Sequence, residues 1–401
     1  MNKTENIMNY AITMVPYYCQ FRKATFEEFP IISKKDIKKD YELFLSKEIQ
    51  NRNYILSCLE KDFEVNNYVI EKKIDNNIYM EWTTGSSGIP FKCIKSGSER
   101  KQIALNMWKQ RMQIDKKIRI DSFYSMIHTG EEALKFDIRD YSKENLTNLY
   151  LDIKNKNTTC IHTTPNLIKR HIEYGDLPLD FFNNIVPYIE MTGNYLSRED
   201  KKKIEKIFGA HILNLYGLIE VWGMAYDPDG NGEFSILEKN VKIELVDKNL
   251  RIIEQNDVEG EIIVTSLNQF YMPFIRYRTG DIGKYVETVD GRKLVLCKDR
   301  DINRLTVRGK QISGSQFAKT ILRKIYWKKE FQDIKYVCIV LNNKTFSFVL
   351  NHISDELEFE KISKNVLQDA VGEGYKVRFD YINEKEYERI NAKNYIFIQK
   401  S

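Results

Sequence analysis

The sequence predicts an α/β protein in which a large N-terminal domain of α/β sheets with a strand-rich subdomain precedes a small α+β domain. Three observations predict this architecture. Between residues 81 and 213, short apolar stretches alternate with amphipathic helical ones, as in a sheet covered by helices. Residues 233–298 are rich in strand-forming side chains, and all eight prolines lie at or before Pro273. A chain of 401 residues is long enough for both domains.

The first part of the chain supplies the helices and the parallel strands. Residues 1–75 read as helices with Lys and Glu on their solvated faces, interrupted at Pro30. After them the hydrophobic periodicity predicts two helices, Ser98–Ile114 and Leu196–Phe208, and two short strands, Ser122–Ile127 and Thr159–Thr163.

The strand-rich stretch predicts a small barrel-like subdomain. Two strands flank the turn Asp247-Lys248-Asn249, and two more follow them. These strands are Val241–Val246, Leu250–Ile253, Gly260–Leu267 and Leu294–Cys297.

The C-terminal part predicts a compact module with its own core. Its pattern is a helix, two strands around Asn342-Asn343, a second helix and a further strand. The helices are expected at Ser315–Lys328 and Leu357–Ala370, and the last strand at Lys376–Ile382. We expect an N-terminal domain of residues 1–298 and a C-terminal domain of residues 299–401.

Composition excludes several classes of protein. Lys and Arg number 62 against 57 Asp and Glu, and the lysines are scattered, which argues against nucleic-acid binding. No signal peptide or span of membrane length occurs. The six cysteines include no Cys-x-x-Cys pair, which favours the cytoplasm. Five histidines lack metal-ligand spacing, so a structural zinc stays unsupported, and a monomer and a homodimer are both open.

The segment Thr83-Thr-Gly-Ser-Ser-Gly-Ile-Pro90 indicates phosphate binding. Four hydroxyl residues and two glycines occupy six positions directly after the apolar run Ile78–Trp82. Small residues let the backbone approach a polyanion, and N–H and hydroxyl groups supply donors. An ordinary surface loop is the alternative, and the absence of a following Gly-Lys-Ser/Thr argues against a P-loop kinase or ATPase.

Three later segments favour the functional interpretation: Leu215–Glu220, Pro273–Asp281 and Arg300–Gly309. With the loop, they resemble in order and separation the acyl-adenylate-forming superfamily, which contains CoA ligases, adenylation domains and luciferases. Phe29–Ile37 and Cys160–Asn166 resemble the phenylacetate–CoA ligase and capsule-biosynthesis ligase branch. The resemblance extends from about residue 25 to the C-terminus.

The resemblance implies an ATP- and Mg²⁺-dependent ligase for a small-molecule carboxylic acid, with residues 299–401 as a mobile lid. The carboxylate attacks the α-phosphorus of ATP and yields an acyl-adenylate. CoA, or the phosphopantetheine of an acyl carrier protein, then displaces AMP. An amine acceptor and a catalytically weak nucleotide-binding protein are the alternatives, the second because Asn303 and Thr306 replace the usual Asp and Lys.

The resemblance also assigns roles within the nucleotide site. Glu220 would face Mg²⁺, and Tyr216 would stack on adenine. Gly217 and Asn194 would also bind the nucleotide, and Asp281 would accept hydrogen bonds from the ribose hydroxyls. Arg300 would lie near ribose and phosphate. The β- and γ-phosphates would be held by Thr83, Thr84, Gly85, Ser86, Ser87 and Gly88. Core packing for Tyr216, a tight turn at Asp281 and a surface ion pair for Arg300 are the structural alternatives.

Lys393 is the candidate catalytic lysine, with Glu220 and Arg300 as further catalytic residues. In Arg389–Asn394, Ala392 takes the glycine position of the superfamily's terminal motif, and the motif's proline is missing. Where many members have lysine directly after the loop proline, Phe91 intervenes before Lys92. The acyl pocket would be lined by Phe123, His128, Gly193, Leu218 and Trp222, and its aromatic residues favour an aromatic acid.

Overall fold

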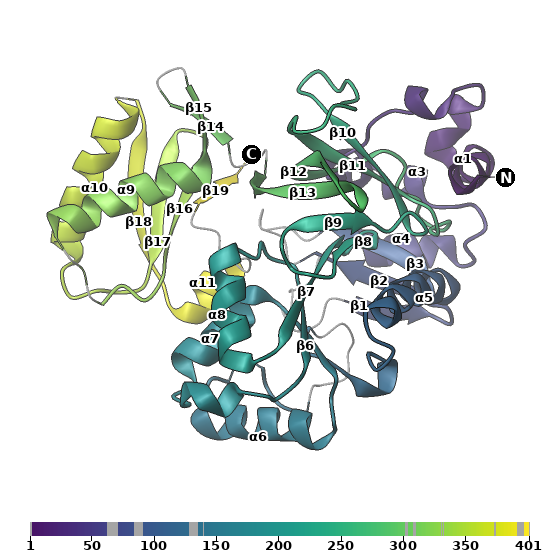
Figure 1. The fold of residues 1–401 in the computed structure, drawn as a ribbon. Coiled ribbons are helices and arrows are strands. Elements are labelled where there is room, and N and C mark those ends of the chain that lie inside the picture. Colours follow the sequence, from purple (N-terminus) through teal and green to yellow (C-terminus); the bar gives the residue numbers. More distant parts are fainter. Residues whose placement is uncertain are drawn as a thin grey trace. The chain divides into compact units, whose positions relative to one another are not determined.

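The computed structural model describes residues 2–61, 71–83, 91–127, 135–138, 140–300, 304–307, 310–329, 331, 333–372, 374–390 and 397–400. These residues form two compact units (Figure 1). The first contains the described residues up to Leu296, apart from Gly280–Ile282. The second contains Gly280–Ile282 and the described residues from Cys297 onward.

The first unit begins with helices, as predicted. Its α-helices are α1 (Lys3–Met14), α2 (Lys34–Lys39), α3 (Tyr41–Phe44) and α4 (Arg52–Glu60), with 3₁₀ turns at Pro16–Phe21 and Phe26–Glu28. A three-stranded antiparallel sheet follows, formed by β1 (Glu71–Asp75), β2 (Ile78–Trp82) and β3 (Lys92–Ser96). The expectation of helix up to residue 75 was wrong at Glu71–Asp75, where pairing with β2 prevails over local pattern.

The centre of the first unit is a ten-stranded sheet with the order β10-β11-β12-β13-β9-β8-β7-β6-β5-β4. Four neighbouring strands are parallel. These are β4 (Phe123–Ser125), β5 (Cys160–Thr163), β6 (Tyr188–Thr192) and β7 (His211–Leu218). The strand β8 (Trp222–Asp227) then turns back antiparallel to β7.

Helices cover both faces of the parallel strands, as the alternating pattern predicts. One face packs in a core with α5 (Gly97–Ile114), through Met107, Trp108 and Ile114. The other packs against α6 (Lys143–Asn155), α7 (Pro165–Tyr174) and α8 (Arg198–Phe208). Helix α8 begins where the Ser197 hydroxyl accepts the Asp200 N–H and ends at Gly209, whose φ is 63°.

The strand-rich stretch contains three of the four expected strands, but they do not close into a separate barrel. They continue the central sheet through the pairing of β9 with β8 and of β13 with β9. The strands are β9 (Glu233–Ile236), β10 (Val241–Val246), β11 (Gly260–Ser266), β12 (Tyr277–Thr288) and β13 (Gly291–Arg300). Only one bridge, between Val246 and Ile252, forms where a strand was expected at Leu250–Ile253.

The second unit has its own sheet of four strands in the order β18-β17-β16-β19. Its elements are β14 (Arg304–Val307), β15 (Lys310–Ser313), α9 (Gly314–Lys328), β16 (Val337–Asn342), β17 (Thr345–Leu350), α10 (Glu356–Val371), β18 (Lys376–Tyr381), α11 (Glu384–Ile390) and β19 (Phe397–Lys400). Helices α9 and α10 share one core with the sheet, and Tyr387 and Ile390 of α11 share another. The predicted helices and strands of this region are therefore confirmed within one or two residues.

Candidate active site

Several of the predicted site residues gather at the carboxyl ends of the parallel strands. Gly193 and Asn194 directly follow β6, and Leu218 ends β7 two residues before Glu220. In open α/β sheets, ligands bind beyond this edge. The topology of the first unit therefore brings the two loops together without any contribution from sequence proximity.

Of the groups in these loops, Glu220 has the most strongly shifted pKa. The residue is 1% exposed, and its Oε1 lies 2.9 Å from Nζ of Lys34 and accepts a hydrogen bond of 2.9 Å from the Tyr277 hydroxyl. Burial alone would raise the pKa of this carboxyl, but the Lys34 charge and these hydrogen bonds lower the pKa to about 2. Glu220 is therefore a buried carboxylate that stays ionised at neutral pH.

Lys34 reaches Glu220 because the chain before α2 is attached to the start of β12. The Ile32 N–H donates to the Arg276 carbonyl over 3.0 Å, and the Arg278 N–H donates back to Ile32 over 2.8 Å. This parallel bridge aligns Ile32 with Tyr277. Sequence reasoning did not assign Lys34 or Tyr277 to the site, although both lie in segments that carry the resemblance.

Phe91 also lies against these residues. Lys34 Nζ is 5.7 Å from the centroid of the Phe91 ring, which stacks with the ring of Tyr277 at 6.4 Å and 24°. Phe91 is 1% exposed. The residue that separates proline from lysine after the phosphate loop is therefore part of the packing beside Glu220.

The turn that carries Glu220 has a strained backbone. Trp222 has a φ of 62°, a left-handed conformation that is costly for a bulky side chain. A Cβ on Gly217 would lie 2.5 Å from the Trp222 carbonyl oxygen, so only glycine allows this close approach. The pairing of β7 with β8 shifts register between Tyr216 and Gly217. The glycine of the motif is thus required by the turn itself.

A buried ion pair holds both ends of this turn. Lys95 donates to the Ile219 carbonyl over 2.8 Å and forms an ion pair with Glu81. Oε2 of Glu81 also accepts the indole N–H of Trp222 over 2.8 Å. Trp222, predicted in the acyl pocket, is therefore fixed through its nitrogen, and Glu81 and Lys95 are supporting residues that sequence reasoning missed.

The described residues on either side of the predicted phosphate loop are hydrogen-bonded to each other. The Thr83 N–H donates to the Phe91 carbonyl over 2.9 Å, and the Phe91 N–H donates to the Thr83 hydroxyl over 3.1 Å. Lys92 is 5% exposed, and its Nζ donates to the carbonyls of Leu59 and Lys61 at the end of α4. Lys92 stabilises a helix C-terminus.

The remaining predicted residues have these positions. Tyr216 is 8% exposed and meets Phe234 edge-on at 6.2 Å. Gly193 has a φ of 76° in the loop after β6. Asp281 lies within β12 after Gly280, whose φ is 75°. Arg300 ends the backbone of β13.

Other predictions fall outside the described residues. These are Thr84, Gly85, Ser86, Ser87, Gly88, His128 and Lys393. Their roles stay predictions, as does the role of the Arg300 side chain.

The donor set near Glu220 suits a metal ion delivered with a nucleotide. Among the described residues, no group of three or more His, Cys, Asp or Glu side chains could hold an ion. Mg²⁺ in ATP sites commonly takes one or two carboxylates and completes its shell with phosphates and water. One ionised carboxylate fits that pattern, and because Lys34 already pairs with it, the ion and the lysine would compete for Glu220.

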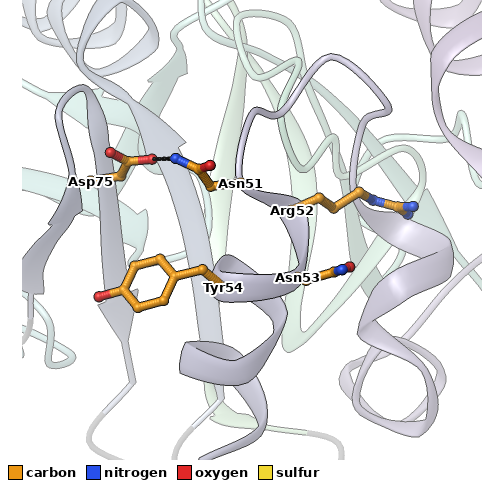
Figure 2. A pocket seen from close by; sticks show the side chains of 5 residues that line it. All are labelled: Asn51, Arg52, Asn53, Tyr54 and Asp75. Carbon is orange, nitrogen blue, oxygen red and sulfur yellow. Dashed lines mark hydrogen bonds between the residues drawn. The ribbon is translucent and has the colours of Figure 1, made fainter.

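A hollow of about 520 Å³ lies elsewhere in the first unit, between α4 and β1 (Figure 2). Asn51, Arg52, Asn53, Tyr54 and Asp75 line it. Its one bond between lining side chains joins Asn51 Nδ2 to Asp75 Oδ2 over 3.2 Å, and the Arg52 guanidinium is bound to the carbonyls of Glu42 and Leu45. None of the predicted site residues that the structure describes lines this hollow.

Solved structures share the fold. The chain is similar to 2-hydroxyisobutyryl-CoA ligase in the postadenylation state in complex with 2-HIB-AMP, with a TM-score of 0.57 and 14% identity over 95% of this chain and 85% of that one. It is also similar to fatty acyl-adenylate ligases from E. coli and L. pneumophila, with a TM-score of 0.53 and 13% identity over 78% and 68% of the two chains. These likenesses confirm the predicted fold class.

The sequence is also similar to that of a CoA ligase. The chain is 25% identical over 181 residues to the phenylacetate–coenzyme A ligase of Pseudomonas putida, a match that spans 44% of this chain and 40% of that protein. It confirms the resemblance to the phenylacetate–CoA ligase branch. No protein-family profile matches the chain. No helix in the described part of the chain is long and apolar enough to cross a membrane.

Proposed function

We propose that this protein is an ATP-dependent acid ligase that forms an acyl-adenylate and passes the acyl group to a thiol. The observation that carries the proposal is Glu220: an ionised carboxylate, 1% exposed, beyond the carboxyl end of β7 in a superfamily fold of adenylate-forming enzymes. The Lys34 charge and the Tyr277 hydroxyl keep this carboxylate ionised, and an ionised carboxylate is the ligand that Mg²⁺ prefers.

In the first half-reaction an oxygen of the acid's carboxylate attacks the α-phosphorus of ATP. The bond from this phosphorus to the bridging oxygen breaks, and pyrophosphate leaves with the electron pair. Negative charge grows on the phosphoryl oxygens, so cations and donors placed there lower the barrier. Bound Mg²⁺ would neutralise phosphate charge, and Glu220 would hold it.

The chain's own residues would fix the nucleotide. Thr83 and the hydroxyl-rich residues after it would bind the β- and γ-phosphates. Tyr216 would stack on adenine, and the Asp281 carboxylate would accept hydrogen bonds from both ribose hydroxyls. When Mg²⁺ binds Glu220, the ion pair between Lys34 and Glu220 would break, and Lys34 would instead pair with the phosphates of ATP. Lys393 would bring a charge to the α-phosphate as residues 299–401, the proposed lid, close.

In the second half-reaction a thiolate attacks the acyl carbon and AMP leaves. CoA and the phosphopantetheine of a carrier protein are the proposed acceptors. The ring of Phe123, with Trp108 edge-on at 5.0 Å, favours an aromatic acid.

Product masses test the proposal directly. Incubation with ATP, Mg²⁺ and a panel of aromatic and aliphatic acids should give AMP and an acyl-adenylate, and addition of CoA should convert the adenylate to a thioester. Asp281→Ala should weaken ATP binding about tenfold or more, as expected for charge-assisted bonds. Asp257→Ala is the matched control because that carboxyl is exposed and pairs only with Lys284 among the described residues. ATP binding without an adenylate of any acid would contradict the proposal.

A further inference from the structure

A buried polar network around Glu190 has no role in the proposed reaction. Glu190 is fully buried, and its carboxylate accepts two hydrogen bonds from Arg111, of 2.8 and 2.7 Å, and one of 2.6 Å from the Tyr226 hydroxyl. Nδ1 of His162 lies 2.8 Å from the same carboxylate. Arg111 and these hydrogen bonds hold the pKa of Glu190 well below its usual range although burial opposes this. The network therefore contains a permanent carboxylate–guanidinium pair.

The register of the parallel strands places this network beside the predicted acyl pocket. Ser125, His162 and Glu190 are cross-strand neighbours on β4, β5 and β6, so their side chains share one face of the sheet. Phe123, two residues before Ser125, is on that face and stacks on the His162 ring at 5.6 Å and 29°. The Arg111 guanidinium of α5 lies 4.7 Å from the Phe123 ring.

Exposure separates His162 from its partners. The side chains of Glu190 and Arg111 are 0% and 6% exposed, whereas that of His162 is 15% exposed and the Phe123 side chain beside it is half-buried. His162 is thus the member of the network that a bound molecule can reach.

The network also fixes which atom of His162 carries the proton. A carboxylate only accepts hydrogen bonds, and two lone pairs 2.8 Å apart would repel, so we place the proton of the neutral ring on Nδ1, although the contact does not meet full hydrogen-bond geometry. In the neutral ring Nε2 is then an acceptor. Among the described residues Nε2 has no hydrogen-bond partner.

We propose that His162 is a specificity-determining residue that accepts a hydrogen bond from a hydroxyl group on the acid, so that the substrates are hydroxylated aromatic carboxylic acids. This inference rests on the proposed function and on Phe123 as a wall of the acyl pocket. A neutral hydroxyl fits better than a second charge, because Glu190 and Arg111 already neutralise each other and a further buried charge would be unpaired.

Matched acids and matched histidine variants test the inference. Acid-dependent exchange of pyrophosphate into ATP is measured with benzoate, 3- and 4-hydroxybenzoate, phenylacetate, its hydroxylated forms and terephthalate. At least one hydroxylated acid should exceed its parent about tenfold or more in kcat/KM, because a site built to bond a hydroxyl rejects the analogue that lacks it.

His162→Phe keeps an aromatic ring against Phe123 but removes the acceptor. It should abolish that preference, mainly by raising KM for the hydroxylated acid. His211→Phe is the control, since His211 is exposed at the start of β7 and binds the Pro228 carbonyl. In wild-type protein labelled with ¹⁵N-histidine, the hydroxylated acid should shift the Nε2 resonance of His162, which requires no variant to fold.

The possible failures are distinguishable. Parent acids that equal or exceed every hydroxylated acid, or a preference that survives in His162→Phe, would overturn the inference and leave the proposed ligase intact. An unmoved Nε2 resonance in the presence of a saturating hydroxylated substrate would do the same. Absence of exchange with every acid, while ATP still binds, would overturn the proposed function and the inference with it.

Discussion

Replacement of Lys34 tests the electrostatics of the candidate site most sharply. Lys34→Met leaves the carboxylate of Glu220 buried with the Tyr277 hydroxyl but without its cation. The pKa of Glu220 falls from 4.5 to about 2 in the folded protein. At about 1.4 kcal/mol per pKa unit, this shift corresponds to about 3 kcal/mol at neutral pH. Because the Lys34 side chain is 39% exposed and solvent screens it, we expect a loss of about 2 kcal/mol.

How stability depends on pH follows from the pKa of Glu220 in the folded and unfolded states. In the wild type the folded pKa is depressed, so the stabilisation is fully present above pH 4.5 and is lost as pH falls toward 2. In Lys34→Met, burial without the cation should raise the folded pKa above the unfolded value. The variant then binds more protons folded than unfolded and loses stability as pH rises. The deficit should therefore be greater at pH 7.5 than at pH 4.5.

Urea unfolding followed by tryptophan fluorescence measures the deficit, since three of the four tryptophans lie in the first unit. Lys35→Met is the matched control: Lys35 is the next residue of α2 and is exposed, so its loss should change stability by less than about 0.5 kcal/mol. In Lys34→Met/Glu220→Gln the buried charge is gone, and part of the stability should return. A deficit equal to that of Lys35→Met, or one that does not vary with pH, would refute the reasoning.

Three further predictions concern packing and catalysis. Arg111→Met should lower the free energy of unfolding in urea by about 3–5 kcal/mol, because it leaves the buried Glu190 carboxylate unpaired. Arg119→Met, in an ion pair whose side chains are more than half exposed, should lower it by less than about 1 kcal/mol. Similar losses in the two variants would contradict this prediction. Gly217→Ala should shift the backbone at Trp222 and lower pyrophosphate exchange, and a crystal structure with that backbone unmoved would argue against it. Lys393→Ala should lower exchange about 10²–10³-fold at nearly unchanged ATP affinity, and wild-type exchange would remove Lys393 from the mechanism.

The sequence predicted elements well where local signals agree. Helices α5, α8, α9 and α10 have matching periodicity and terminal residues, and they lie within two residues of their predicted bounds. Glu71–Asp75 was misread because its strand depends on pairing with β2, which no local pattern encodes. The strand-rich region was taken for a separate barrel because the pairing of β9 with both β8 and β13 is a long-range property.

The candidate site shows the same division. Motif order pointed to Glu220 and Gly217, and the strain at Trp222 gives the glycine a physical reason. Lys34 could not be assigned to Glu220 from sequence, because 186 positions separate them and their contact depends on the bridge between Ile32 and Tyr277. The pairing of Arg111 with Glu190 was equally inaccessible, although the apolar pattern placed the arginine on a helix and His162 on a strand.

Pyrophosphate exchange tests the central claim, that an acid is activated on ATP at the loop that carries Glu220. With radiolabelled pyrophosphate, the protein should return label to ATP only when Mg²⁺ and a suitable acid are both present, and Glu220→Gln should reduce that return strongly. Label that returns without any acid, or none with any acid while ATP remains bound, would contradict the account.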